Sequence, residues 1–169
     1  MTTLLLPDEG REITNRVEIE ATLAKVNVLY RHFPQATQYT EKDDETLLAE
    51  HRPLVEPHLE IHALDVMRVN VGDPKLQEMR DAFKREHQHS EDEIRFLLHG
   101  EGTFWLHAGG QVYGANIGPG DLLRLPAGIK HWFTFPDPPL VTLRFYQTKD
   151  GWAATFTGSG KEQQYAHLV

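Results

Sequence analysis

The sequence predicts an all-β core folded as a jelly-roll barrel, with peripheral α-helices packed against it. From residue 87 onward, short runs that alternate apolar and polar residues, such as "GTFWLH", "DLLRLP" and "LVTLRFYQ", follow one another closely. Turn-forming clusters such as "GPGD" and "PDPP" separate these runs. Many short strands divided by Gly- and Pro-rich turns are typical of a sandwich or a closed barrel.

The N-terminal half mixes strand and helix signals. "KVNVLYRHF" alternates as a half-buried strand does. Residues 43–65 have a helical pattern, which Pro53 and Pro57 should break into pieces. A further helix should have Asp73 at its N-cap and Pro74 at its first position. Its apolar residues share one helical face: Leu76, Met79 and Phe83.

The length and the sequence pattern of the chain favour a single domain spanning residues 1–169. A chain of this length can bury a core of its own, and it contains neither an internal repeat nor a Pro/Gly linker. We expect residues 1–84 to pack on the barrel, residues 85–158 to form it, and residues 159–169 to be a flexible tail.

Composition argues against several classes of function. The formal net charge of −8 is unfavourable for nucleic-acid binding, which needs clustered Lys and Arg. The absence of cysteine excludes disulfides, thiolate metal sites and cysteine nucleophiles. No apolar run is long enough to span a bilayer, and the N-terminus lacks the pattern of a signal peptide. We therefore expect a cytoplasmic protein that binds no membrane.

The segment "EHQHSEDEIRFLLHGEG", residues 86–102, holds three histidines and five carboxylates. His87 and His89 are two residues apart, so on a strand they project from the same face. Glu93 can join them only if the chain bends around "SED", because six extended residues span roughly 20 Å. The competing interpretation is a solvated charge run, which is what we expect for Glu86, Glu91 and Glu101.

Two motifs favour the metal site over the charge run. His131 opens a strand directly after a Pro/Gly turn, where its side chain can point into a barrel. Together the two segments resemble the cupin motifs H-x-H-x3-E-x6-G and G-x5-P-x-G-x2-H. The matching residues are His87, His89, Glu93 and Gly100 in the first, and Gly120, Pro126, Gly128 and His131 in the second. The resemblance implies a cupin jelly-roll barrel (a double-stranded β-helix).

The sequence departs from these motifs at two positions outside the ligands. Asp81 stands where the first motif usually begins with Gly, and Phe135 replaces the usual Asn that ends the second. Three imidazoles and one carboxylate suit an octahedral Fe(II), Ni(II), Mn(II) or Co(II) ion with two adjacent positions left open. The site should therefore favour a bidentate anionic oxygen ligand. Which metal occupies it should depend on which metal ions are available.

A narrower resemblance is to the acireductone dioxygenase family of methionine salvage. It rests on "EHQHSEDEIRF" followed by "GEGTFWLH", on "AGIKHWFTF" and "LRFYQTKDGWAATFTG", and on the preceding "MRDAFKREH". It implies one Fe(II) or Ni(II) ion per chain, and the substrates 1,2-dihydroxy-3-keto-5-methylthiopentene and O2. With Fe(II) the products would be formate and 4-methylthio-2-oxobutanoate. With Ni(II) they would be formate, carbon monoxide and 3-methylthiopropanoate.

Five further residues are candidates for the substrate pocket. Arg95 lies two residues beyond Glu93, so it should share the inward face and hold an enediolate oxygen. Arg144 interrupts an apolar strand and is the second catalytic candidate, with outward exposure as the alternative. Aromatic residues should wall the pocket around a methylthioalkyl tail, although each is also a common core residue: Phe83, Phe133 and Trp152.

The sequence also contains other histidines and leaves other functions open. His58 and His62 have helical i, i+4 spacing but no third ligand, which favours a solvated helix face. Asp92 could support a ligand histidine or face water. The alternative functions are a cupin isomerase acting on a sugar or keto acid, and a non-catalytic cupin that binds a small molecule. We expect a monomer.

Overall fold

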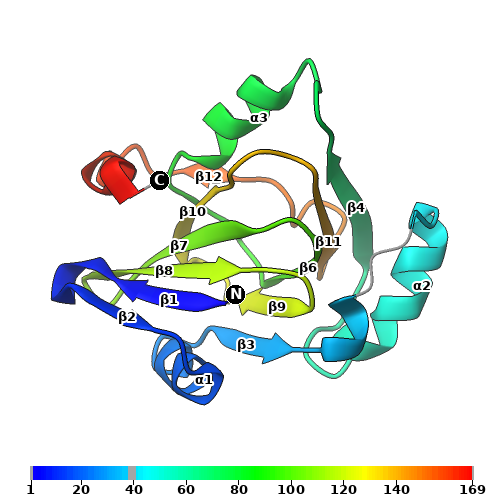
Figure 1. Ribbon diagram of the computed structural model, residues 1–169, viewed down its shortest axis with the longest axis horizontal. Coiled ribbons are helices and arrows are strands. Elements are labelled where there is room, and N and C mark those ends of the chain that lie inside the picture. The colour runs from blue at the N-terminus through cyan, green and yellow to red at the C-terminus, as the bar shows by residue number, and fades with distance from the viewer. Residues whose placement is uncertain (1, 38–40, 169) are drawn as a thin grey trace.

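Two antiparallel sheets form the molecule in this computed structural model, which describes residues 2–37 and 41–168 (Figure 1). The larger sheet has the strand order β12-β5-β10-β7-β8-β1-β2, and the smaller has the order β3-β9-β6-β11-β4. The larger sheet contains β1 Thr3–Leu6, β2 Arg11–Ile13, β5 His87–Gln88, β7 Gly102–Ala108, β8 Gln111–Ile117, β10 Lys130–Thr134 and β12 Thr155–Phe156. The smaller contains β3 Leu29–His32, β4 Ala63–Val69, β6 Glu93–His99, β9 Asp121–Leu125 and β11 Leu140–Tyr146.

The helices lie outside the two sheets. They are α1 Arg16–Ala24, α2 Asp44–Val55 and α3 Leu76–Phe83, with short 3-10 helices η1 Pro7–Glu9, η2 Pro34–Thr37 and η3 Lys161–Leu168. None of the helices in the described ranges is long and apolar enough to cross a membrane. The predicted all-β core with peripheral α-helices is confirmed.

The alternation of side chains along the strands builds two separate hydrophobic layers. On β6, Leu97 points between the sheets into the main core, while Phe96 and Leu98 point away from it. The outward residues pack with Leu47 and Val55 of α2, so this helix covers the outer face of the smaller sheet. The inner face is left free to combine core residues with functional ones.

Two predictions about helix ends were wrong. Pro53 lies inside α2 and does not break it, because the helix face that packs on the smaller sheet continues past it: Leu47, His51 and Val55. Only Pro57 lies beyond the helix end. The third helix begins at Leu76 rather than after Asp73, whose side chain accepts a hydrogen bond from the Lys75 amide at 2.8 Å. Asp73 therefore closes a turn before the helix.

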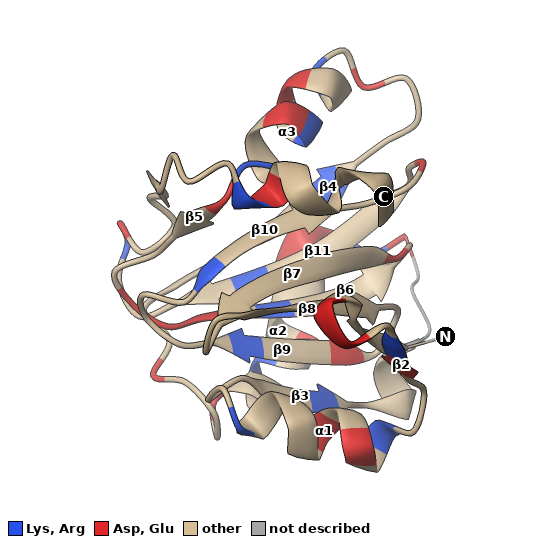
Figure 2. Ribbon diagram, turned by 90° about the vertical axis from the view of Figure 1, so that its left-hand side faces the viewer, with Lys and Arg blue, Asp and Glu red and all other residues tan. Residues whose placement is uncertain are grey.

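Two further expectations about secondary structure also differ from the structure. His58 lies in a turn and His62 just before β4, so their spacing is not helical. The C-terminal tail is docked rather than flexible: Tyr165 is buried, packs against Trp105 and Trp132, and donates a hydrogen bond to Asp8 at 2.7 Å. Figures 1 and 2 show this terminal helix beside β10.

Candidate metal centre

Three histidines converge between the two sheets. His87 on β5 is the cross-strand partner of His131 on β10, and His89 follows β5 directly. All three side chains are buried, and one nitrogen of each lies within 4.8 Å of the others. The alternation of side chains along β5 and the pairing of β5 with β10 thus bring together residues that are 44 positions apart in the sequence.

The outer nitrogen of each imidazole is bonded to a backbone carbonyl. His87 Nδ1 lies 2.7 Å from Arg85 O, His89 Nδ1 3.0 Å from Ala153 O, and His131 Nδ1 3.0 Å from Ile129 O. A carbonyl only accepts, so each Nδ1 carries the proton and each Nε2 presents a lone pair to the interior. Burial lowers the pKa of His87 to about 4 and also lowers the pKa of His89, which favours the neutral, ligating form.

Glu93 lies beside two of these histidines, His89 and His131, and comes from the opposite sheet. The chain bends after His89, as predicted, and Glu93 opens β6 with its side chain almost fully buried. Its Oε1 lies 3.3 Å from His131 Nε2, and its Oε2 lies 3.6 Å from His89 Nε2 and 3.2 Å from Arg95 Nη2. Burial alone would raise the pKa of this carboxyl, but the positive charge of Arg95 holds it well below its usual range.

The unpaired lone pairs at this site fit a divalent cation. His89 Nε2 and both oxygens of Glu93 are buried without a hydrogen-bond partner among the described residues. Buried acceptors of this kind are rare in folded proteins. A metal ion accepts electron pairs from several sides at once, and the imidazole and carboxylate donors suit a first-row transition metal.

The chain around the ligands differs from the prediction at two acidic residues. Glu86 is buried rather than solvated, because its carboxylate accepts hydrogen bonds from His107 Nδ1 at 2.8 Å and from the Thr157 and Ser159 hydroxyls at 2.6 Å. These bonds hold the segment around β12 beside β5. Asp92 accepts from the Ala127 amide at 2.8 Å, in the turn before His131, and the ligand histidines bond to backbone carbonyls instead.

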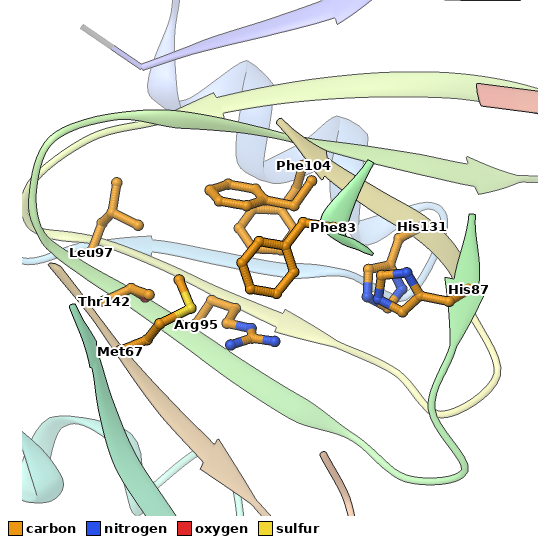
Figure 3. Close-up of a pocket in the computed structure, with 9 residues that line it drawn as sticks. Met67, Phe83, His87, Arg95, Leu97, Phe104, His131 and Thr142 are labelled. Carbon is orange, nitrogen blue, oxygen red and sulfur yellow. The ribbon is translucent and has the colours of Figure 1, made fainter. Parts of the chain in front are cut away.

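A cavity opens beside the histidines (Figure 3). Its lining residues are Met67, Phe83, His87, Arg95, Leu97, Phe104, His131, Phe133 and Thr142. The ring centroids of Phe83 and Phe133 lie 6.4 Å apart, and Phe135 stacks behind Phe133 at 5.7 Å. Gly102 makes room for this wall, since a Cβ there would lie 2.3 Å from Phe133 Cζ.

The structure separates the other predicted pocket residues. Arg95 lines the cavity and contacts Glu93. Arg144 is the cross-strand partner of Arg95, so it shares the inner face, but it does not line the cavity. Its guanidinium instead pairs with Asp65 through two hydrogen bonds of 2.6 and 2.5 Å. Trp152 is 61% exposed and is not brought to the cavity.

Sequence reasoning missed Tyr146, which ends β11 opposite Glu93. It is 3% exposed, and its ring centroid lies 6.3 Å from that of His89 and 5.8 Å from Arg95 Cζ. The signal was available, because Tyr146 follows Arg144 by two residues and so belongs to the same face of the strand.

A barrel of two antiparallel sheets, with three histidines and one glutamate converging inside it, defines a metal-binding cupin. The family model of the ARD/ARD' family matches residues 8–154. This chain belongs to that family.

Similar proteins agree with this assignment. The chain is 39% identical over 152 residues to acireductone dioxygenase of Gluconobacter oxydans, covering 87% of this chain and 81% of the relative. It is 40% identical over 145 residues to acireductone dioxygenase of Granulibacter bethesdensis, covering 83% and 81%. Among solved structures, acireductone dioxygenase from Bacillus anthracis with a cadmium ion in its active centre superposes with a TM-score of 0.82 at 26% identity, covering 92% of this chain and 98% of that one.

Proposed function

We propose that this protein is a metal-dependent dioxygenase that cleaves the acireductone 1,2-dihydroxy-3-keto-5-methylthiopentene with O2 in methionine salvage. The observation that carries the proposal is the convergence of three imidazoles at one end of a cavity with an apolar wall, with the Glu93 carboxylate beside two of them. The names of the relatives at 39 and 40% identity point to the same reaction.

Four residues would hold the metal: His87, His89, Glu93 and His131. The bound ion, Fe(II) or Ni(II), one per chain, would supply Lewis-acid binding of the two vicinal oxygens of the enediol. The ion carries two positive charges, Glu93 one negative charge and Arg95 one positive charge. The buried site therefore has a net charge of about +2. That balance favours the ionised substrate over the neutral enediol.

The remaining residues would bind and orient the substrate. Arg95 presents a permanently charged, planar guanidinium to an enediolate oxygen. Phe83 and Phe133 would wall the methylthioalkyl tail and exclude water from the reacting end. Arg144 lies across the β6–β11 pair from Arg95 and is already paired with Asp65, so it would support the inner face rather than bind the substrate.

Reconstitution of the metal-free protein tests this function. With Fe(II) and O2 we expect formate and 4-methylthio-2-oxobutanoate, and with Ni(II) formate, carbon monoxide and 3-methylthiopropanoate. O2 uptake distinguishes a dioxygenase from an isomerase, which would consume the substrate without O2. Absence of O2 uptake with either metal, at full metal occupancy, would contradict the proposal.

Two properties of the whole protein are part of the same proposal. It acts as a monomer in the cytoplasm, with no nucleic-acid or membrane partner. One chain is enough to form the metal centre, because all four proposed ligands come from two facing sheets of the same chain. Light scattering after gel filtration would test the oligomeric state.

A further inference from the structure

Buried polar atoms without a partner gather around the metal centre. In the described part of the chain, nine buried side-chain nitrogen and oxygen atoms have no hydrogen-bond partner. Five of these nine belong to four neighbouring residues on the inner face: His89 Nε2, Glu93 Oε1, Glu93 Oε2, Arg95 Nε and the Tyr146 hydroxyl. More than half of such atoms therefore belong to one site.

These five atoms fall into two chemical kinds. His89 Nε2 and the two Glu93 oxygens carry lone pairs, and a metal ion can satisfy all three. Arg95 Nε is a donor, and a phenolic hydroxyl also donates. A cation cannot accept a hydrogen bond, so these two residues call for a second group that carries acceptor oxygens.

Tyr146 is placed to serve such a group. It lies opposite Glu93 across the β6–β11 pair, and Arg144 lies opposite Arg95 in the same register. Period-two alternation puts Tyr146 on the same face of β11 as Thr142, which lines the cavity, while Tyr146 itself lies outside that lining, on the side of His89 and Glu93. Arg95 Cζ lies 5.8 Å from the centroid of the Tyr146 ring. A phenolic hydroxyl carries a proton that it can donate.

Apolar packing alone does not account for this hydroxyl. A phenylalanine would fill the same space without burying an unpaired polar atom, which folded proteins avoid. Tyr30 on the same sheet shows the ordinary arrangement: it is also buried, and its hydroxyl donates to Asp121 Oδ1 at 2.8 Å.

We propose that the Tyr146 hydroxyl donates a hydrogen bond to an anionic oxygen of the bound enediolate, beside Arg95. This inference rests on the proposed function and deepens it, since it adds a substrate-binding residue outside both metal-binding motifs. It assigns Tyr146 to substrate recognition rather than to metal binding or to the stability of the barrel.

The matched variants Tyr146→Phe and Tyr30→Phe test the proposal in the Fe(II)-loaded protein. For Tyr146→Phe we expect unchanged metal content and an unchanged or higher Tm. Its KM for acireductone, and its Kd in anaerobic equilibrium binding, should rise roughly 10- to 100-fold, because a hydrogen bond to a charged acceptor is worth that much. For Tyr30→Phe we expect a lower Tm, because a buried bond is lost, with KM unchanged.

Three results would overturn the inference. A Tyr146→Phe variant that retains metal, with KM and Kd within about twofold of wild type, would show that the hydroxyl does not contact the substrate. A variant that loses the metal would assign the hydroxyl to the ion instead. Absence of turnover in the wild-type protein would reject the proposed function itself, and this inference with it.

Discussion

The metal-free protein should lose stability as the pH falls from about 6.5 to 4, because of the buried histidines. Burial is the main cause that lowers the pKa of His87 from the ordinary 6.5 to about 4, and the neighbouring His131 is the second cause. Between these two pH values His87 is protonated in the unfolded chain but neutral in the folded protein. The stability contributed by the neutral imidazole is complete above pH 6.5 and is lost as the pH falls toward 4.

The size of the effect follows from the shift. Each pKa unit corresponds to about 1.4 kcal/mol. A shift from 6.5 to about 4 therefore removes roughly 3–4 kcal/mol in total, at a slope of about 1.4 kcal/mol per pH unit. The pKa of His89 is lowered in the same direction, so the wild-type slope should be at least this steep.

Urea unfolding of the chelator-treated protein between pH 7 and 4.5 measures this slope. His87→Gln removes one titrating group, so its unfolding free energy should fall less steeply, by about 1.4 kcal/mol per pH unit. His62→Gln is the control, because the His62 side chain is 59% exposed, and its slope should match the wild type. A wild-type stability that is flat over this range, or equal slopes in wild type and His87→Gln, would refute the reasoning.

Three further predictions concern the ligands, the cavity wall and the tail. Glu93→Ala should abolish metal retention and turnover, as measured by elemental analysis and O2 uptake; full activity would contradict the ligand assignment. Gly102→Ala should destabilise the protein by roughly 1–3 kcal/mol, because its Cβ would overlap Phe133, and a Tm equal to wild type would contradict this packing. Tyr165→Ala should cost roughly 3 kcal/mol in urea unfolding, whereas a freely moving tail would leave stability unchanged.

The parts of the site that could be predicted from the sequence depend on short-range geometry. His87 and His89 share a face because strand side chains alternate, and the same rule places Arg95 on the inner face with Glu93. Gly100 also has a local reason, since its φ of +76° favours glycine.

The parts that could not be predicted depend on long-range contacts. Glu86 looks like one more charge in a polar run until residues more than 70 positions later supply its hydroxyl donors. The tail residue Tyr165 is buried only because Trp105 and Trp132 lie side by side on neighbouring strands. Arg144 has the inward parity that the sequence suggests, but Asp65, which pairs with it, comes from a strand 79 residues away.

The division of the site between the two sheets would give a bound metal a structural role as well. The larger sheet supplies the histidines through β5 and β10, and the smaller sheet supplies Glu93, Arg95 and Tyr146 through β6 and β11. Without the cation, Glu93 faces buried lone pairs across the barrel and relies on Arg95 for its charge partner. An ion bound by both sheets would turn this unfavourable contact into a link between them. Because such an ion binds the folded protein in preference to the unfolded chain, it would add to the free energy of unfolding in proportion to the logarithm of its concentration over Kd.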